Sequence, residues 1–209
     1  PVEDVVVDYL EVPGQKRPDS EFILVVAADR HRIASLAGGF QRSGLDLHSI
    51  GILPLALRNL MARLAGAGAG LGLLHLGTDS AHINLGRGET LYLSRSIDTS
   101  AEALEKAVET ATEGMTPNVF LDISLEVQRS LDYYDAYFSD PPIPRLALTG
   151  ASAQALAALR DYLDGSLALD VAPAELETAF ELPADGLDET AACLPALGEA
   201  LRAAEGGEA

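Results

Sequence analysis

The sequence predicts an α/β fold in which a mixed sheet is flanked by helices. With 209 residues, 48% of them apolar and 22% charged, the chain can bury a substantial core. Short apolar runs bounded by Gly, Pro and Asp are typical of strands, and they occur beside segments with apolar residues at helical spacing. Three successive strand patterns are followed by helix and strand patterns in alternation, an order typical of sheets covered by helices.

The N-terminal quarter is expected to form two strands, a helix and a further strand. Residues 2–12 and 21–28 are apolar runs separated by a turn with Pro and Gly, a pattern typical of an antiparallel hairpin. Asp29 is a predicted helix cap, and Gly44 is the predicted stop of that helix. The next strand is predicted over residues 46–52.

A second helix and a β-meander are predicted next. Pro54 suits the first turn of the helix, which ends in a connector of alternating Ala and Gly over residues 65–70. The meander strands are predicted over residues 71–76, 81–85 and 90–97, joined by two short turns.

The C-terminal half alternates helices with single strands. A helix capped by Asp98 or Thr99 is predicted to end near residue 113, before an amphipathic helix over residues 119–138. Further elements are predicted over residues 145–149 (strand), 153–163 (helix), 167–171 (strand) and 188–204 (helix), with 206–209 as a tail. Three meandering strands followed by helix, strand, helix, strand and helix match the order of a ribonuclease-H-like unit.

Composition narrows the classes of function. Thirty-two acidic against 14 basic residues give a net charge of −18, which disfavours binding to nucleic acid and to anionic membrane surfaces. Cys193 is the single cysteine, so a reduced, cytoplasmic setting is expected. The apolar runs are too short or too close to charged residues to predict a membrane-spanning helix, and no direct membrane insertion is expected.

Common catalytic and metal-binding signatures are absent from the sequence, including the Walker loop, HExxH and GxGxxG. His75 and His82 have no ligand-spaced partner and are interpreted as strand histidines. Four glutamates at helical spacing indicate a solvated helix face. These are Glu102, Glu105, Glu109 and Glu113. We therefore expect no catalytic residue and no metal site.

Two turns could bind a phosphate group. Residues 77–80, with the sequence GTDS, join two predicted core strands, and residues 150–152, with the sequence GAS, join a strand to a helix. Backbone N–H groups in such turns can cradle an anion, yet the same residue types also favour ordinary turns. The spacing alone leaves both interpretations open.

Five segments in order carry a resemblance to a known family. They are PVEDVVVDY (1–9), ALRNL (56–60), LYLSRSID (91–98), LEVQRSLDYY (125–134) and CLPALGEALR (193–202). Over almost its whole length the chain resembles PilM-like proteins of the MshI type, which serve the biogenesis of MSHA-type pili. The resemblance implies an actin-like ATPase (ribonuclease-H-like) fold.

In that fold, residues 1–53 would be the end of the first lobe, with the order β-β-α-β, and residues 54–205 the second lobe. The chain begins at Pro1 without Met, so we interpret it as a fragment that lacks the N-terminal part of the first lobe.

PilM-like proteins lie on the cytoplasmic face of the bacterial inner membrane. They bind the cytoplasmic tail of a PilN-like membrane protein and belong to the pilus platform. The implied role is therefore a non-catalytic scaffold peripheral to the inner membrane, with a PilN-like tail and other platform proteins as partners. The oligomeric state stays open.

The resemblance also implies a remnant nucleotide site. His75 stands where the family usually has the Asp that precedes the second phosphate turn, which disfavours hydrolysis. Of the glycines in the adenosine motif only Gly150 remains, so ATP and Mg²⁺ are disfavoured as ligands. The residues carried over to this remnant are Gly77, Thr78, Ser80, Glu126, Arg129, Gly150 and Ser152.

Alternatives remain for the site and for the function. Glu126 and Arg129 have the spacing of an ion pair within one helix, which is an alternative to contact with a ribose. An active ATPase of the actin or heat-shock-chaperone type is one alternative function. The cytoplasmic domain of a GspL-like type II secretion protein is another.

Overall fold

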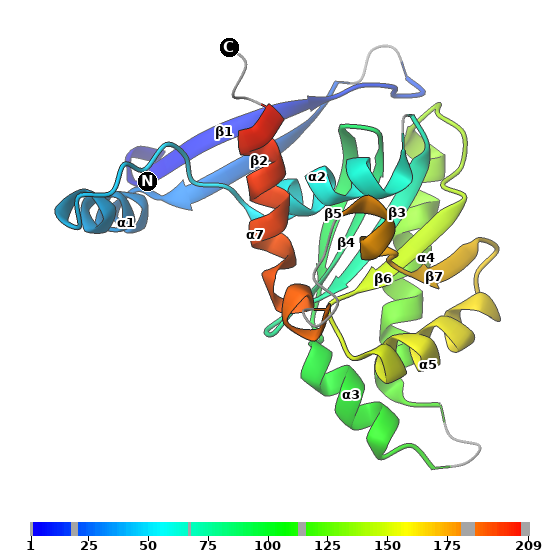
Figure 1. The fold of residues 1–209 in the computed structure, drawn as a ribbon. Coiled ribbons are helices and arrows are strands. Elements are labelled where there is room, and N and C mark those ends of the chain that lie inside the picture. Colours follow the sequence, from blue (N-terminus) through cyan, green and yellow to red (C-terminus); the bar gives the residue numbers. More distant parts are fainter. Residues whose placement is uncertain (1, 18–20, 67, 113–115, 181–186, 206–209) are drawn as a thin grey trace.

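The fold is built around a mixed sheet of five strands in the order β5-β4-β3-β6-β7 (Figure 1). The computed structural model describes residues 2–17, 21–66, 68–112, 116–180 and 187–205. Strands β3, β4 and β5 pair antiparallel, whereas β6 and β7 extend the sheet in parallel from β3. The strands are β3 (Gly70–Leu76), β4 (Ala81–Arg87), β5 (Thr90–Ile97), β6 (Arg145–Thr149) and β7 (Asp170–Pro173).

Helices cover both faces of this sheet. One face carries α3 (Ala101–Glu109), α4 (Asn118–Tyr137) and α5 (Ala153–Asp164), and the other carries α2 (Leu53–Ala65), α6 (Leu176–Ala179) and α7 (Leu187–Glu205). Strand β3 is buried along its whole length because both of its faces are covered. The predicted α/β fold with a mixed sheet flanked by helices is confirmed.

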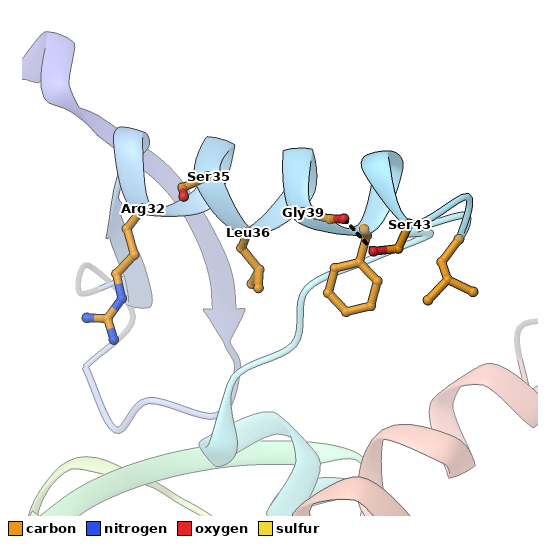
Figure 2. A pocket seen from close by; sticks show the side chains of 7 residues that line it. Arg32, Ser35, Leu36, Gly39 and Ser43 are labelled. Carbon is orange, nitrogen blue, oxygen red and sulfur yellow. Dashed lines mark hydrogen bonds between the residues drawn. The ribbon is translucent and has the colours of Figure 1, made fainter.

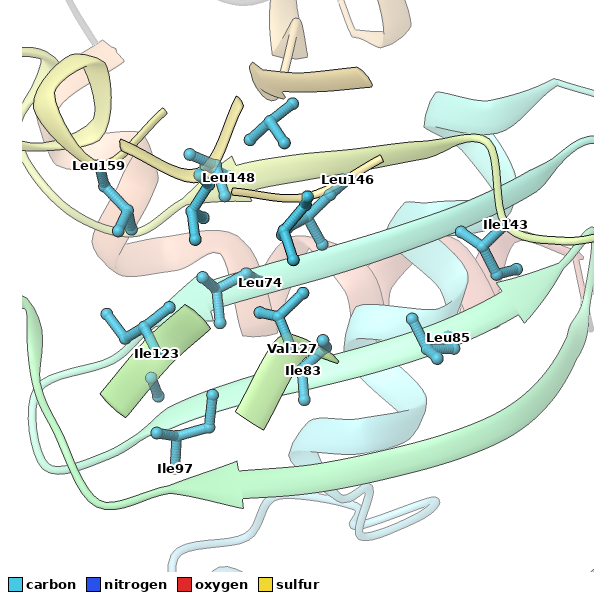
Figure 3. Close-up of a cluster of buried hydrophobic side chains, with 14 of the residues drawn as sticks. Leu74, Ile83, Leu85, Ile97, Ile123, Val127, Ile143, Leu146, Leu148 and Leu159 are labelled. Carbon is cyan, nitrogen blue, oxygen red and sulfur yellow. The ribbon is translucent and has the colours of Figure 1, made fainter. Parts of the chain in front are cut away.

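The two faces of β3 contribute to two separate hydrophobic clusters. Leu74 packs with Ile83, Ile123 and Val127 on the α4 side, as Figure 3 shows. Leu71 and Leu73 point to the other face and pack against α2. This alternation fixes the register of the sheet, because a slip of one residue would exchange the two faces.

A two-stranded ribbon and one helix extend away from the five-stranded sheet (Figure 1). A short 3₁₀ helix, η1 (Val2–Asp4), precedes β1 (Val5–Val12), which pairs antiparallel with β2 (Phe22–Asp29), and α1 (Arg30–Arg42) follows. Asp29 caps α1 as predicted, because its side chain accepts a hydrogen bond from the backbone N–H of Arg32.

The ribbon is anchored to the main sheet at its turn. Val12 is 3% exposed, and the backbone N–H of Lys16 donates to the carbonyl of Tyr137 at 2.8 Å. The ring of Phe22 packs on that of Tyr137, with centroids 5.6 Å apart. Helix α4 therefore holds the end of β1 and the start of β2. Val7 and Val25 lie on the same face of the ribbon as each other, and both side chains are exposed.

The prediction of a strand over residues 46–52 was wrong. The structure contains no strand there, and the segment connects α1 to α2 with side chains that are exposed or half-buried. A strand needs a neighbour that supplies hydrogen bonds, and the sheet of β1 and β2 has no third described strand. The predicted β-β-α-β order of residues 1–53 is therefore β-β-α in this part of the chain.

Three smaller predictions also need correction. The last strand is β7, three residues later than predicted, because parallel pairing with β6 places Asp170 opposite Arg145. The cap of α3 is neither Asp98 nor Thr99 but Ser100, whose Oγ accepts from the backbone N–H of Ala103. Helix α3 also ends at Glu109, earlier than predicted. Helix α6 was not predicted, and the tail 206–209 lies outside the described residues.

Candidate functional site

A cleft of about 740 Å³ opens where β3 and β6 end. The two strands are parallel, with His75 opposite Thr149, so the turns that follow them lie at the same edge of the sheet. Ligands of open α/β sheets commonly bind outside the carboxyl ends of such strands. The cleft is lined by both turns, by the start of α3 and α5, by α6 and by Pro195 of α7.

The first turn, residues 77–80, is closed on itself. The backbone N–H of Gly77 donates to the carbonyl of Ser80 at 3.1 Å, and the Gly77 carbonyl accepts from Ala101 at 2.9 Å. A Cβ atom at position 77 would lie 2.7 Å from the Ser80 carbonyl oxygen, so the turn requires Gly. One N–H group that could have bound a phosphate is therefore used within the turn itself.

The second turn brings β6 close to the end of β3. Gly150 has a φ of +95°, and a Cβ atom there would lie 2.1 Å from the carbonyl oxygen of Leu76. Ser152 follows as the N-cap of α5. Its backbone N–H donates to Oε1 of Glu105 at 2.8 Å, so a carboxylate from α3 occupies the start of α5.

His75 is buried at the floor of the cleft. Its side chain is 5% exposed, it lies opposite His82 on β4, and its Nδ1 has no hydrogen-bond partner within the described part of the chain. Burial, with a smaller contribution from His82, lowers the pKa of His75 to about 4. At neutral pH the ring is therefore uncharged and does not supply the negative charge that a carboxylate would have at this position.

Five of the seven predicted site residues line the cleft together. These are Gly77, Thr78, Ser80, Gly150 and Ser152. Glu126 and Arg129 on α4 are not among the lining residues. Oε1 of Glu126 accepts from Nη1 of Arg129 at 2.5 Å, and Oε2 of Glu126 lies 4.0 Å from Nη1 of Arg95. The structure thus contains the intrahelical ion pair that was the alternative for these two residues.

Sequence reasoning missed Glu105. Its only signal was the helical spacing of four glutamates, which predicted a solvated face. The charged residues that line the cleft are Asp79, Glu105 and Glu177, so the described lining contains carboxylates and no Lys or Arg. Within the described residues, no group of three or more His, Cys, Asp or Glu side chains could hold a metal ion.

A second hollow, of about 780 Å³, lies along α1 (Figure 2). Leu36, Phe40 and Leu45 line it with Arg32 at one end, and the Ser43 hydroxyl donates to the Gly39 carbonyl at 3.1 Å. Its three large apolar side chains are exposed. This hollow offers an apolar contact surface but no group of reactive side chains.

Comparison with known proteins identifies the fold. No family model matches the sequence, and no curated protein matches it. Among solved structures the chain is similar to the PilM–PilN type IV pilus biogenesis complex, with 20% identity over 96% of this chain and 67% of that chain, at a TM-score of 0.63. It is also similar to ethanolamine utilization protein EutJ from Carboxydothermus hydrogenoformans, with 15% identity over 88% of this chain and 62% of that chain, at a TM-score of 0.51.

These likenesses show an actin-like ATPase fold, as the sequence predicted. The chain spans about two thirds of the length of the PilM chain, and less than two thirds of the EutJ chain. No helix in the described residues has the length and apolar character needed to cross a bilayer.

Proposed function

We propose that this protein is a PilM-like scaffold in the inner-membrane platform of type IV pilus biogenesis, and that it serves MSHA-type pili as MshI-like proteins do. The observation that carries the proposal is the likeness to PilM of the PilM–PilN complex, which extends over 96% of this chain. The segments ALRNL, LYLSRSID and CLPALGEALR support the MshI type within that class.

In this proposal the partner is the cytoplasmic tail of a PilN-like inner-membrane protein, with other platform proteins as further contacts. The protein would lie in the cytoplasm, peripheral to the inner membrane. Its net charge of −18 favours a partner with basic residues beside its membrane span, because opposite charges steer association. Residues 1–53 would belong to the first lobe of the actin-like fold, and residues 54–205 would form the second.

The proposed scaffold does not hydrolyse ATP, and four features of the cleft support this. A neutral imidazole at His75 stands where the family has a carboxylate, and the N–H group of Gly77 is used within its own turn. The charged lining is acidic, so it repels phosphate groups. Ala151 and Ser152 bring Cβ atoms to positions where the family's adenosine motif has Gly.

Binding to the partner tail tests this function. A labelled peptide with the sequence of the PilN-like cytoplasmic tail from the same genome is titrated with the protein, and fluorescence anisotropy is recorded. We expect saturable binding that weakens as salt is added, because screening reduces steering between opposite charges. A peptide of the same composition in scrambled order is the control. No binding to the native tail, or equal binding to both peptides, would contradict the proposal.

A further inference from the structure

We propose that Glu105 sets the ligand specificity of the cleft, because its carboxylate takes the place of an anion at the start of α5 and keeps phosphate-bearing ligands out. This inference rests on the proposed function, in which the cleft binds no nucleotide, and it explains how nucleotides are kept out. It concerns a residue for which the sequence predicted no role beyond a solvated surface.

The geometry of Glu105 is that of a bound anion. Oε1 lies 2.8 Å from the backbone nitrogen of Ser152, the N-cap of the 12-residue helix α5, although the two residues are 47 positions apart in sequence. The first N–H groups of a helix lack partners within the helix and carry a partial positive charge, so they attract anions. The Glu105 carboxylate on α3 accepts the hydrogen bond of the Ser152 N–H group, where a bound anion could otherwise accept it.

The charge around this contact strengthens the exclusion. Asp79 in the first turn and Glu177 on α6 line the same cleft as Glu105, and the described lining includes no basic residue. A phosphate entering the cleft would therefore meet three carboxylates without a cation to offset them. Asp79 and Glu177 are exposed and Glu105 is half-buried, so this repulsion is greatest at low ionic strength and weakens as salt is added.

His75 is independent evidence that the cleft has an unused binding capacity. Its Nδ1 is buried and has no hydrogen-bond partner among the described residues, and it lies 2.9 Å from the point where a Cβ atom at Gly150 would sit. A buried polar group without a hydrogen bond is costly, so it favours a ligand or water that can satisfy it. The cleft therefore has an unsatisfied polar atom in its wall, next to the turn that leads into α5, whose start Glu105 already occupies.

Two substitutions at Glu105 test the proposal, with inorganic pyrophosphate as the probe. E105A removes the charge and frees the Ser152 N–H group, whereas E105Q removes the charge but keeps an oxygen acceptor. The control is E102Q, which makes the same change of charge on the exposed face of α3. Binding is measured by calorimetry and by the amide shift of Ser152 in heteronuclear NMR.

We expect E105A to bind pyrophosphate at least about tenfold more tightly than the wild type, since a charge-assisted hydrogen bond becomes available. E105Q should gain less, and E102Q should match the wild type. An equal gain in E102Q, or no gain in either Glu105 variant, would overturn the inference and leave the partner-binding proposal intact. Tight pyrophosphate binding by the wild type, with no further gain in E105A, would overturn both the inference and the nucleotide-free cleft. Thermal melts establish folding, and E105Q decides the question if E105A fails to fold.

Discussion

His75 on β3 lies directly opposite His82 on β4, and in the part of the chain that the structure describes neither Nδ1 atom has a hydrogen-bond partner. Burial is the largest cause of a lowered pKa in both rings. The protein thus holds two neighbouring imidazoles in its sheet that resist protonation, and His75 forms part of the cleft wall.

This pair predicts a loss of stability in acid. The pKa of His75 falls from 6.5 in the unfolded chain to about 4 in the folded protein, so the unfolded chain binds more protons between these values. The free energy of unfolding should therefore fall as the pH drops from about 6.5 to 4, by up to about 3 kcal/mol from His75. Urea unfolding midpoints at pH 7, 5 and 4 measure it.

The matched variant for this prediction is His75→Gln, which keeps a polar side chain but does not titrate. Carboxylate titration affects both proteins, so the difference between their pH profiles isolates the histidine. The variant should lose less stability between pH 7 and pH 4 than the wild type. Parallel profiles would show that His75 does not carry the acid sensitivity.

The close approach of β6 to β3 makes Gly150 sensitive to substitution. Gly150→Ala should lower the free energy of unfolding by about 2 kcal/mol or more, because φ is +95° and the new Cβ would meet the Leu76 carbonyl. Gly165→Ala is the control, since a Cβ there lies no closer than 3.7 Å to the nearest atom and φ is −76°. Similar losses in both variants would count against this geometry.

The cap of α3 offers a direct comparison of neighbouring hydroxyl residues. Ser100→Ala removes the oxygen that accepts from the Ala103 N–H group, and it should cost about 1 kcal/mol of stability. Thr99→Ala should cost less, because Ser100 and not Thr99 is the N-cap. Thermal denaturation of the two variants distinguishes them, and a larger loss for Thr99→Ala would place the cap one residue earlier.

Two of the segments that carry the family resemblance contact each other through Asn59 and Gly198. Nδ2 of Asn59 on α2 donates to the carbonyl of Gly198 on α7 at 2.9 Å, and a Cβ atom at position 198 would lie 2.1 Å from the Ala56 carbonyl oxygen. The two helices can pack this closely only because residue 198 has no side chain.

Gly198→Ala should therefore destabilise the protein by about 2 kcal/mol or more, although Ala favours a helix over Gly by about 1 kcal/mol. The control is Gly39→Ala within α1, where a Cβ atom has nothing within 4 Å and the helix should gain stability. Chemical denaturation of both variants gives the sign of each change. A gain in both would mean that α2 and α7 are not tightly packed at this point.

Local patterns predicted the central sheet well and failed where a long-range partner decides the structure. The apolar runs of β5 and β6 were bounded correctly, because turn-forming residues stand close to their ends: Gly88 and Asp98 for β5, Pro144 and Gly150 for β6. Residues 46–52 have a strand-like composition but no neighbouring strand, which the local sequence does not reveal.

The same distinction applies to the candidate site. The family resemblance assigned the two turns to one site, and the structure places them at the same edge of the sheet because β3 and β6 pair in parallel. The contact between Glu105 and Ser152 depends on how α3 docks against α5 across 47 residues of sequence, so spacing alone gave no sign of it. Glu126 and Arg129 shared a helix face as predicted, but the spacing did not reveal that this face lies beside Arg95 of β5.

Calorimetry of ATP with Mg²⁺ binding to the wild-type protein tests the central claim of a non-catalytic scaffold most directly. A double variant, His75→Asp with Ala151→Gly, introduces the residues that PilM-like proteins are expected to have at these two positions and serves as the comparison. We expect no detectable binding or phosphate release by the wild type and partial recovery of binding in the double variant. Micromolar binding with turnover by the wild type would contradict the claim of a non-catalytic scaffold.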